Sequence, residues 1–220
     1  MMYKFSIFIL LLCLSACGNS SGPAPLIDPQ TDHKNDEQNA FTIRKLNGKP
    51  GWDNQINYLL AEELDQSRYA NIFNIDFDAT DLSLLGCSNY NELSLNEKKL
   101  FIIVFLAAIA ERESDFDPNN MTYDPSHKNW NIGLLQIDTR SALRHANAEL
   151  TEAQLKDSFI NLKIGISIFQ NQITGKYRQE LNGKLFTGKS FYWEVLNDTY
   201  KHRVIKSFLN NRSNLPFCQI

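Results

Sequence analysis

The chain has 220 residues, of which 43% are hydrophobic and 21% charged, and its formal net charge at pH 7 is −3. This length fits one globular domain with a short additional segment. Because the lysines and arginines are scattered and not in excess, the chain lacks the positive surface that neutralises phosphates, so we expect no nucleic-acid partner.

The N-terminus predicts export. Lys4 precedes an apolar run from Phe5 to Leu12, and small residues follow around Ala16. This order is typical of a signal peptide. The run is shorter than the roughly 20 residues of a membrane-spanning helix, so we expect no anchor of that kind.

Residues Leu14 to Cys17 resemble the lipobox of bacterial lipoproteins, in which cleavage falls before a cysteine whose thiol carries the lipid. The resemblance implies a signal peptide over residues 1–16 and a membrane anchor through lipid on Cys17. Gly18 is not the aspartate associated with inner-membrane retention, so we expect a periplasmic protein anchored in the outer membrane. An ordinary signal peptide with an incidental Cys17 is the alternative.

Residues 17–40 predict a flexible tether, because Gly, Ser, Pro, Asn, Asp and Gln dominate there. The composition becomes globular from Phe41, and we assign residues 41–220 to one domain. Its first apolar residues recur at helical spacing from Trp52 to Leu64.

The middle of the chain predicts a buried helix. Residues Ser94 to Glu97 match a capping box, which places the start of a helix that runs to about Arg112. Residues Leu100 to Ala110 are apolar on all sides, so this helix should be central, and Pro118 enforces a stop after it.

A second capping pattern, from Thr151 to Gln154, predicts an amphipathic helix that reaches Ile173. Because no run of alternating strands occurs, the predicted fold is mainly α, with a small β element between Asn119 and Ile132. Further helices are expected near Arg140 to Ala148, Phe191 to Leu196 and Tyr200 to Leu209.

Two cysteines remain for the folded domain, since Cys13 lies in the leader and Cys17 would be lipidated. An oxidising compartment permits a disulfide between Cys87 and Cys218, and two free thiols are the alternative. No Cys and His cluster with ligand spacing occurs, so we expect no metal and no cofactor.

Two glutamates near the end of the central helix are candidate acids. Burial raises the pKa of a carboxyl group, and the end of a buried helix beside a cleft provides that setting. Helical periodicity does not choose between Glu111 and Glu113, because each continues an apolar line of the helix. Surface charges before a turn are the ordinary alternative.

Three segments resemble the lytic transglycosylases with a soluble-transglycosylase domain, which belong to the lysozyme-like superfamily. They are Glu113 to Pro118, then Gly133 to Gln136 with Leu135 where the family has Met, and then Asn161, Leu162 and Gly165. The resemblance covers about residues 100–172. It implies a lysozyme-like fold, and it makes Glu113 the catalytic acid. It also implies a substrate-binding wall formed by Ser114, Gly133, Leu134, Leu135 and Gln136.

The family's third motif, Ala-Tyr-Asn-Ala-Gly, is absent. Tyr192 stands at about the expected distance and is our candidate for the motif's substrate-binding tyrosine, with core packing as the alternative. The neighbouring Trp193 could stack on a sugar ring, but aromatic residues at helical spacing are more often core.

The resemblance implies a peptidoglycan substrate and cleavage of the β-1,4 bond between N-acetylmuramic acid and N-acetylglucosamine, with 1,6-anhydro-muramic ends as products. The first alternative is a muramidase-type hydrolase, which needs a second carboxylate. Candidates for it are Asp115, Asp117, Asp124 and Asp138, each more simply a turn or cap residue. The second alternative is an inactive glycan-binding envelope lipoprotein.

Overall fold

The structure is a computed structural model that describes residues 41–43, 46, 48–189 and 191–218. The predicted signal peptide (1–16), the lipidated Cys17 and the tether (17–40) lie outside these residues. Within the described ranges, no helix combines the length and apolar character that crossing a bilayer requires.

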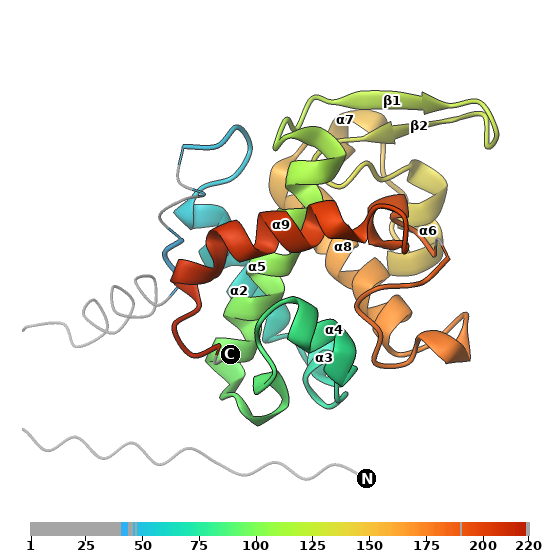
Figure 1. The fold of residues 1–220 in the computed structure, drawn as a ribbon. Coiled ribbons are helices and arrows are strands. Elements are labelled where there is room, and N and C mark those ends of the chain that lie inside the picture. Colours follow the sequence, from blue (N-terminus) through green and yellow to red (C-terminus); the bar gives the residue numbers. More distant parts are fainter. Residues whose placement is uncertain (1–40, 44–45, 47, 190, 219–220) are drawn as a thin grey trace, which may run out of the picture.

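The fold is mainly α-helical, with one two-stranded antiparallel sheet at its edge (Figure 1). This confirms the predicted fold class and the β element between Asn119 and Ile132. The strands are β1 (Met121–Asp124) and β2 (Asn129–Ile132), paired from Met121 opposite Ile132 to Asp124 opposite Asn129. The helices are α2 (Asn54–Leu64), α3 (Ala70–Phe73), α4 (Ala79–Leu84), α5 (Leu95–Ser114), α6 (Thr139–Ala146), α7 (Glu152–Leu155), α8 (Ser158–Ile173) and α9 (Lys201–Asn211). Short 3-10 turns lie at Ser67–Tyr69, Tyr90–Glu92, Gln179–Leu181, Glu194–Leu196 and Arg212–Asn214.

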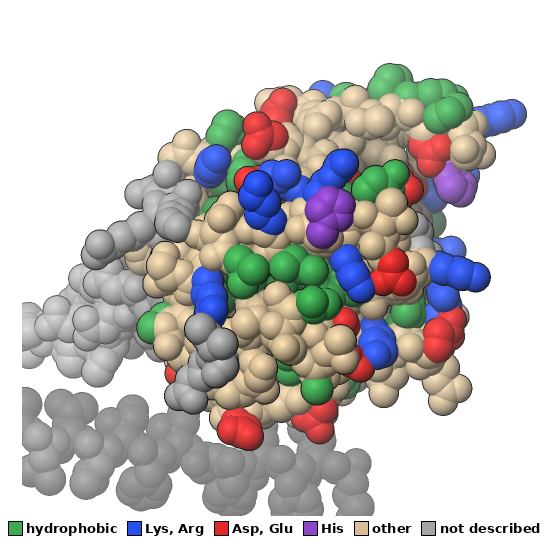
Figure 2. Space-filling model, in the orientation of Figure 1, with side chains coloured by type: hydrophobic (Ala, Val, Ile, Leu, Met, Phe, Trp, Pro, Cys, Tyr) green, Lys and Arg blue, Asp and Glu red, His purple; other side chains and the backbone are tan. Residues whose placement is uncertain are grey.

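The surface is mixed in character. On the face shown in Figure 2, basic side chains gather over α9 and hydrophobic side chains lie over the β1–β2 hairpin. Two of the hairpin's aromatic residues, Tyr123 and Trp130, are directly paired across the strands, with ring centroids 5.2 Å apart, and both are exposed.

Helix α5 forms the centre of the domain. It begins at the predicted capping box, where the Ser94 N–H and O–H both donate to Glu97 Oε2, at 2.9 and 2.6 Å. It ends at Ser114, two residues beyond the predicted end, and the next residue, Asp115, has a left-handed φ of 53°. Residues 101–110 are fully buried, as their all-round apolar sequence predicts.

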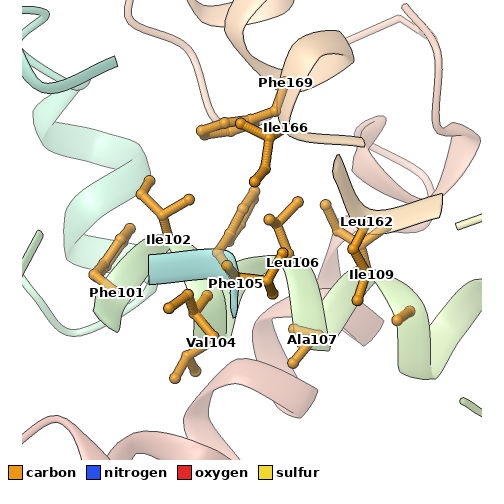
Figure 3. Packing of buried hydrophobic residues seen from close by; sticks show 14 of the residues in the cluster. Phe101, Ile102, Val104, Phe105, Leu106, Ala107, Ile109, Leu162, Ile166 and Phe169 are labelled. Carbon is orange, nitrogen blue, oxygen red and sulfur yellow. The ribbon is translucent and has the colours of Figure 1, made fainter. Parts of the chain in front are cut away.

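Aromatic rings join α5 to the helices on either side of it. The Phe105 ring lies 5.8 Å from that of Phe169 in α8, and the Phe101 ring lies 5.1 Å from that of Phe208 in α9. Figure 3 shows Ile166 and Phe169 of α8 above Phe105. A buried phenylalanine side chain contributes about 1.5–3 kcal/mol, so these rings fix the helix that carries Glu113.

Two predicted helices differ in the structure. The capping pattern at Thr151 starts only the short α7, and the Asp157 carboxylate, which accepts from the Ile160 N–H at 2.9 Å, starts α8 as a new helix. The expected helix from Phe191 to Leu196 is reduced to a 3-10 turn over its last three residues. There the backbone is extended at Trp193, which buries its ring.

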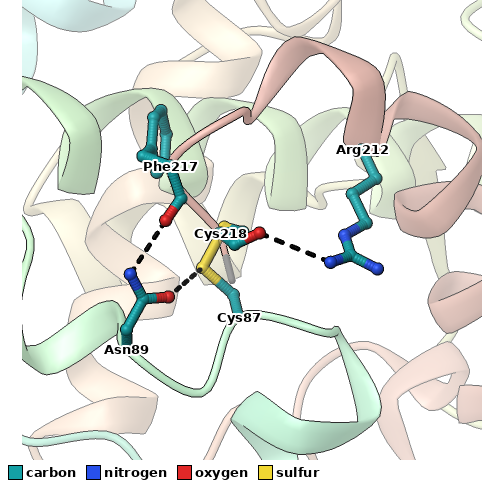
Figure 4. Close-up of a disulfide and its surroundings, with 5 residues drawn as sticks. All are labelled: Cys87, Asn89, Arg212, Phe217 and Cys218. Carbon is teal, nitrogen blue, oxygen red and sulfur yellow. Dashed lines mark hydrogen bonds between the residues drawn. A yellow bond between two sulfur atoms is a disulfide. The ribbon is translucent and has the colours of Figure 1, made fainter. Parts of the chain in front are cut away.

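A disulfide joins Cys87 to Cys218 and ties the C-terminal segment to the loop between α4 and α5 (Figure 4). Asn89 Nδ2 donates to the Phe217 carbonyl at 2.8 Å, and Arg212 Nη2 donates to the Cys218 carbonyl at 3.4 Å. The last described residues are therefore held by covalent and hydrogen bonds together.

Candidate active site

A pocket of about 730 Å³ lies beside the C-terminal end of α5. Its walls come from the β1–β2 hairpin, the loop that leads to α6, α6 itself and the segments around residues 177–178 and 191–194. Four carboxyl side chains line it: Glu113, Asp124, Asp138 and Glu194.

The structure distinguishes Glu111 from Glu113, which helical periodicity did not do. Glu111 faces α9, where it accepts a short hydrogen bond from the Ser207 hydroxyl and pairs with Arg112 Nη2 at 2.9 Å. Glu113 lines the pocket and makes no ion pair with the residues that the structure describes. Glu113 is therefore the helix-end acid that a ligand in the pocket can reach.

The surroundings of Glu113 favour its protonated form. Burial, with a smaller contribution from the negative charge of Glu194, raises the pKa of Glu113 from 4.5 to about 7. An acid with a pKa near neutrality can both donate a proton and take one back, which suits general acid–base catalysis.

The loop from Gly133 to Gln136 is shaped by Asn161 of α8. Its side-chain oxygen accepts from the Leu135 N–H, and its amide nitrogen donates to the Ile132 and Leu155 carbonyls, each at 2.9 Å. Gly133 has a φ of 75°, and a Cβ there would lie 2.5 Å from the Leu155 carbonyl oxygen, so only glycine fits.

Gln136 stands at the end of this loop with a left-handed φ of 49°, and it lines the pocket. Its Nε2 donates to the Gly133 carbonyl at 2.9 Å and to the Asn120 carbonyl at 3.2 Å, which uses both amide hydrogens. Its buried Oε1 accepts no hydrogen bond from the described residues. The side chain therefore has an acceptor, but no donor, left for a ligand.

Four residues of the predicted substrate-binding wall lie behind the pocket and do not line it. Leu134 and Leu135 are fully buried, and Gly165 makes room for Leu135, since a Cβ at Gly165 would lie 2.1 Å from Leu135 Cδ1. Ser114 Oγ donates to the Leu134 carbonyl at 2.9 Å. Together with Gly133, these residues support the pocket wall from its core side. Their side chains pack against the core and their polar groups bond to other protein groups, so they do not contact a ligand in the pocket.

Tyr192 lines the pocket, and its hydroxyl donates to the Gln136 carbonyl at 3.5 Å. Burial raises the pKa of Tyr192, and the charges of Asp138 and Glu113 act in the same direction. The hydroxyl thus stays protonated beside the candidate acid. Trp193 belongs to the core: the residue is 2% exposed, and its Nε1 donates to the Leu135 carbonyl at 2.9 Å.

Two of the four aspartates that could assist hydrolysis line the pocket, and both have local hydrogen bonds. Asp138 caps α6 by accepting from the Arg140 and Ser141 N–H groups, each at 3.0 Å. Asp124 accepts from the Ser126 N–H and from His127 in the hairpin turn. Asp115 and Asp117 lie in the turn after α5 and do not line the pocket.

Sequence reasoning missed several pocket residues. Glu194 follows Tyr192 closely, so the search for the third motif could have found it. The residues from α6 and from the segment after α8, Arg144, His145 and Tyr177, carry no motif that marks them. Across the described residues, no group of three or more His, Cys, Asp or Glu side chains is placed to hold a metal ion.

Part of the chain is similar to a known protein family, and its fold is similar to that of solved structures. Residues 97–185 match the family model of the transglycosylase SLT domain. Among solved structures, the chain is similar to Bd0314 DslA in its wild-type form 2, with 23% identity and a TM-score of 0.59 over 75% of this chain and 91% of that one. A mutant of the same protein matches with 24% identity and a TM-score of 0.57, over the same shares of both chains. No match was found among curated proteins.

The matched region contains the helix with Glu113, the hairpin, the Gly133–Gln136 loop and Asn161. The structural similarity covers the fold, and together with the family match it confirms the lysozyme-like architecture expected from the three motifs.

Proposed function

We propose that the chain is a lytic transglycosylase that cleaves the glycan strands of peptidoglycan, because residues 97–185 match the transglycosylase SLT domain. The observation that carries the proposal is the partly buried Glu113 with its pKa raised to about 7 in a pocket of about 730 Å³. A pure binding site has no need of a desolvated acid at this position.

In the proposed reaction, Glu113 protonates the glycosidic oxygen between N-acetylmuramic acid and N-acetylglucosamine, and the bond from this oxygen to the anomeric carbon breaks. The resulting Glu113 carboxylate takes the proton of the C6 hydroxyl of the muramic sugar, whose oxygen attacks the same anomeric carbon. The products are a 1,6-anhydro end and a new 4-hydroxyl end, and Glu113 regains its proton.

Other pocket residues would position the substrate. The Gln136 Oε1 is buried and has no partner among the described residues, so it suits an N–H or O–H of the sugar, such as the acetamido N–H. The Tyr192 hydroxyl lies at the same wall, within reach of the Gln136 carbonyl. Both would hold the sugar ring against Glu113.

Hydrolysis of the glycan strand is the second candidate function, and the position of Glu194 favours it. This carboxylate lines the same pocket, interacts electrostatically with Glu113, and accepts no side-chain hydrogen bond from the described part of the chain. A carboxylate in that position could activate a water molecule that attacks the anomeric carbon, which would leave a reducing end.

Mass spectrometry of the muropeptides released from purified murein sacculi distinguishes the candidates. We expect the wild-type chain to release 1,6-anhydro products and Glu113→Gln to release none. Reducing-end products that disappear in Glu194→Gln would instead establish the hydrolase. Release of nothing by the wild type, with retained binding to sacculi, would mean an inactive glycan-binding protein.

We also propose that lipid on Cys17 anchors the enzyme in the outer membrane, facing the periplasm, with residues 17–40 as the tether. The basis is the lipobox-like sequence alone. Metabolic labelling with a radioactive fatty acid should label the wild-type chain and not Cys17→Ala, and the variant should leave the membrane fraction. Equal labelling of both would refute the anchor.

A further inference from the structure

Arginine side chains line the pocket together with its four carboxyl groups. Three arginines line it, and two of them have acidic partners: Arg140 Nε lies 4.0 Å from Asp138 Oδ1, and Arg178 Nε lies 2.8 Å from Glu180 Oε1. The third, Arg144, makes no ion pair with any carboxylate in the described ranges. It is exposed on α6, so its charge faces the solvent of the pocket.

An aromatic support holds Arg144 in place. Its guanidinium carbon lies 4.9 Å from the centre of the Tyr177 ring, and the Tyr177 hydroxyl donates to the Arg144 carbonyl at 3.2 Å. The Tyr177 ring is stacked on Phe191 and meets the edge of His145, with centroids 6.5 and 5.3 Å away. A guanidinium stacked on a supported ring loses less side-chain freedom when it binds a ligand.

The second cation at this ring strengthens the positive potential. Lys176 precedes Tyr177 in the chain, and its Nζ lies 5.3 Å from the centre of the Tyr177 ring. His145 adds no charge near neutrality, because burial lowers its pKa to about 4, with the charges of Arg144 and Lys176 acting in the same direction. Arg144 is therefore the cation at this part of the pocket, and Lys176 lies close to the same ring.

We propose that Arg144 and Tyr177 form a subsite for a carboxylate that is attached to the glycan strand. The proposal rests on the proposed function of the same pocket. The planar guanidinium fork matches a carboxylate with two parallel hydrogen bonds, and the ring beneath fixes its plane. Such a subsite would read a substituent of the strand, whereas Glu113 acts on the bond between its sugars.

Peptidoglycan offers this chemistry from two sources. The lactyl group of muramic acid ends in a free carboxylate where no peptide is attached, and the stem peptides carry free carboxylates of their own. Both present the same planar anion to Arg144. Strands that carry only one of these sources can separate them.

The test compares cleavage of three substrates by the full-length chain in detergent. They are peptide-bearing strands, strands stripped of peptides by an amidase, and stripped strands whose carboxylates have been converted to methylamides. We expect Arg144→Gln to lower kcat/KM about tenfold on a strand whose carboxylate is read, since charge-assisted hydrogen bonds contribute at least about 1.5 kcal/mol. A loss on stripped strands alone identifies the lactyl group, and a loss on peptide-bearing strands alone identifies the peptide.

A matched control lies on α9. Arg203 is also an exposed helical arginine stacked on a tyrosine, with its guanidinium carbon 5.4 Å from the Tyr200 ring centre, but it does not line the pocket. Arg203→Gln should leave kcat/KM unchanged on all three substrates. Arg144→Lys should recover part of the loss on carboxylate-bearing strands, because it restores the charge without the fork.

Two results would overturn the subsite. One is an equal kcat/KM of wild type and Arg144→Gln on both carboxylate-bearing strands, and the other is a loss that persists on the methylamide strands. The wild type alone provides a check that does not depend on a variant's folding, because methylamidation should lower its kcat/KM by the same factor if the lactyl group is read.

Binding measurements keep this proposal apart from the proposed function. The Kd of each strand is measured for Glu113→Gln with and without Arg144→Gln. If the wild type cleaves no strand but Arg144→Gln still weakens binding of carboxylate-bearing strands alone, the subsite stands and the lytic activity fails. If cleavage occurs and neither Kd nor kcat/KM depends on the carboxylate, the activity stands and the subsite fails.

Discussion

Replacing Glu113 by glutamine should change how stability depends on pH, because the folded structure holds a proton that the unfolded chain releases. The pKa of Glu113 rises from 4.5 to about 7, mainly through burial. Each pKa unit corresponds to about 1.4 kcal/mol, so the rise is equivalent to about 3 kcal/mol in the free energy of unfolding.

The direction follows from proton binding. Between about pH 4.5 and about pH 7 the folded chain keeps the Glu113 proton, while the unfolded chain has lost it, so stability falls as the pH rises through this range. Above about pH 7 the folded chain bears a desolvated carboxylate and the full loss is present. Glu113→Gln does not titrate, so relative to wild type it should become more stable by about 3 kcal/mol between about pH 4 and about pH 8.

Urea unfolding of the oxidised proteins at several pH values measures this difference. The urea dependence of the free energy of unfolding should be the same in both proteins, which shows that the variant unfolds from an equally compact state. A stability difference between wild type and Glu113→Gln that does not vary with pH would refute the argument, since the carboxyl would then titrate as in the unfolded chain. Glu194→Gln removes a like charge near Glu113 and should lower the pKa of Glu113. The pH dependence of the free energy of unfolding should then be smaller, and the fall of kcat/KM at alkaline pH should begin at a lower pH.

Three further perturbations test the contacts that hold the fold and the site in place. Removing the disulfide by Cys87→Ser with Cys218→Ser should lower the free energy of unfolding by up to about 5 kcal/mol, because the bond closes a loop with a sequence separation of 131; an unchanged urea midpoint would contradict this. Gly165→Ala should lower the free energy of unfolding by about 1–3 kcal/mol, because the new methyl group would collide with Leu135. In a Leu135→Ala background the same substitution should leave the free energy of unfolding unchanged or raise it, because alanine favours the helix. Calorimetry measures both effects. Asn161→Ala leaves the buried Leu135 N–H without its partner and should lower the free energy of unfolding by at least about 2 kcal/mol. The loss of kcat/KM should be larger than the shift in thermal midpoint explains. Full activity at normal stability would refute the role of Asn161 in shaping the loop.

Local sequence predicted the central part of the fold because its signals are short-range. The capping box at Ser94 and the uniformly apolar run after it identify the start of α5 and its burial without any knowledge of partners. The same reasoning failed where a second local signal competed. Asp157 is itself a good N-cap, so it ended the helix that the pattern at Thr151 began.

The sequence by itself determined the helical class of the domain, the buried helix that presents the acid, and the three motifs whose resemblance singled out Glu113. Tertiary structure decided which residues surround that acid. It turned Glu111 toward Ser207, and it brought Glu194 and Arg144 from distant segments to the pocket. The physical reason is that helical periodicity records only which side of a helix is apolar, whereas a binding site depends on the packing of elements that are far apart in the chain.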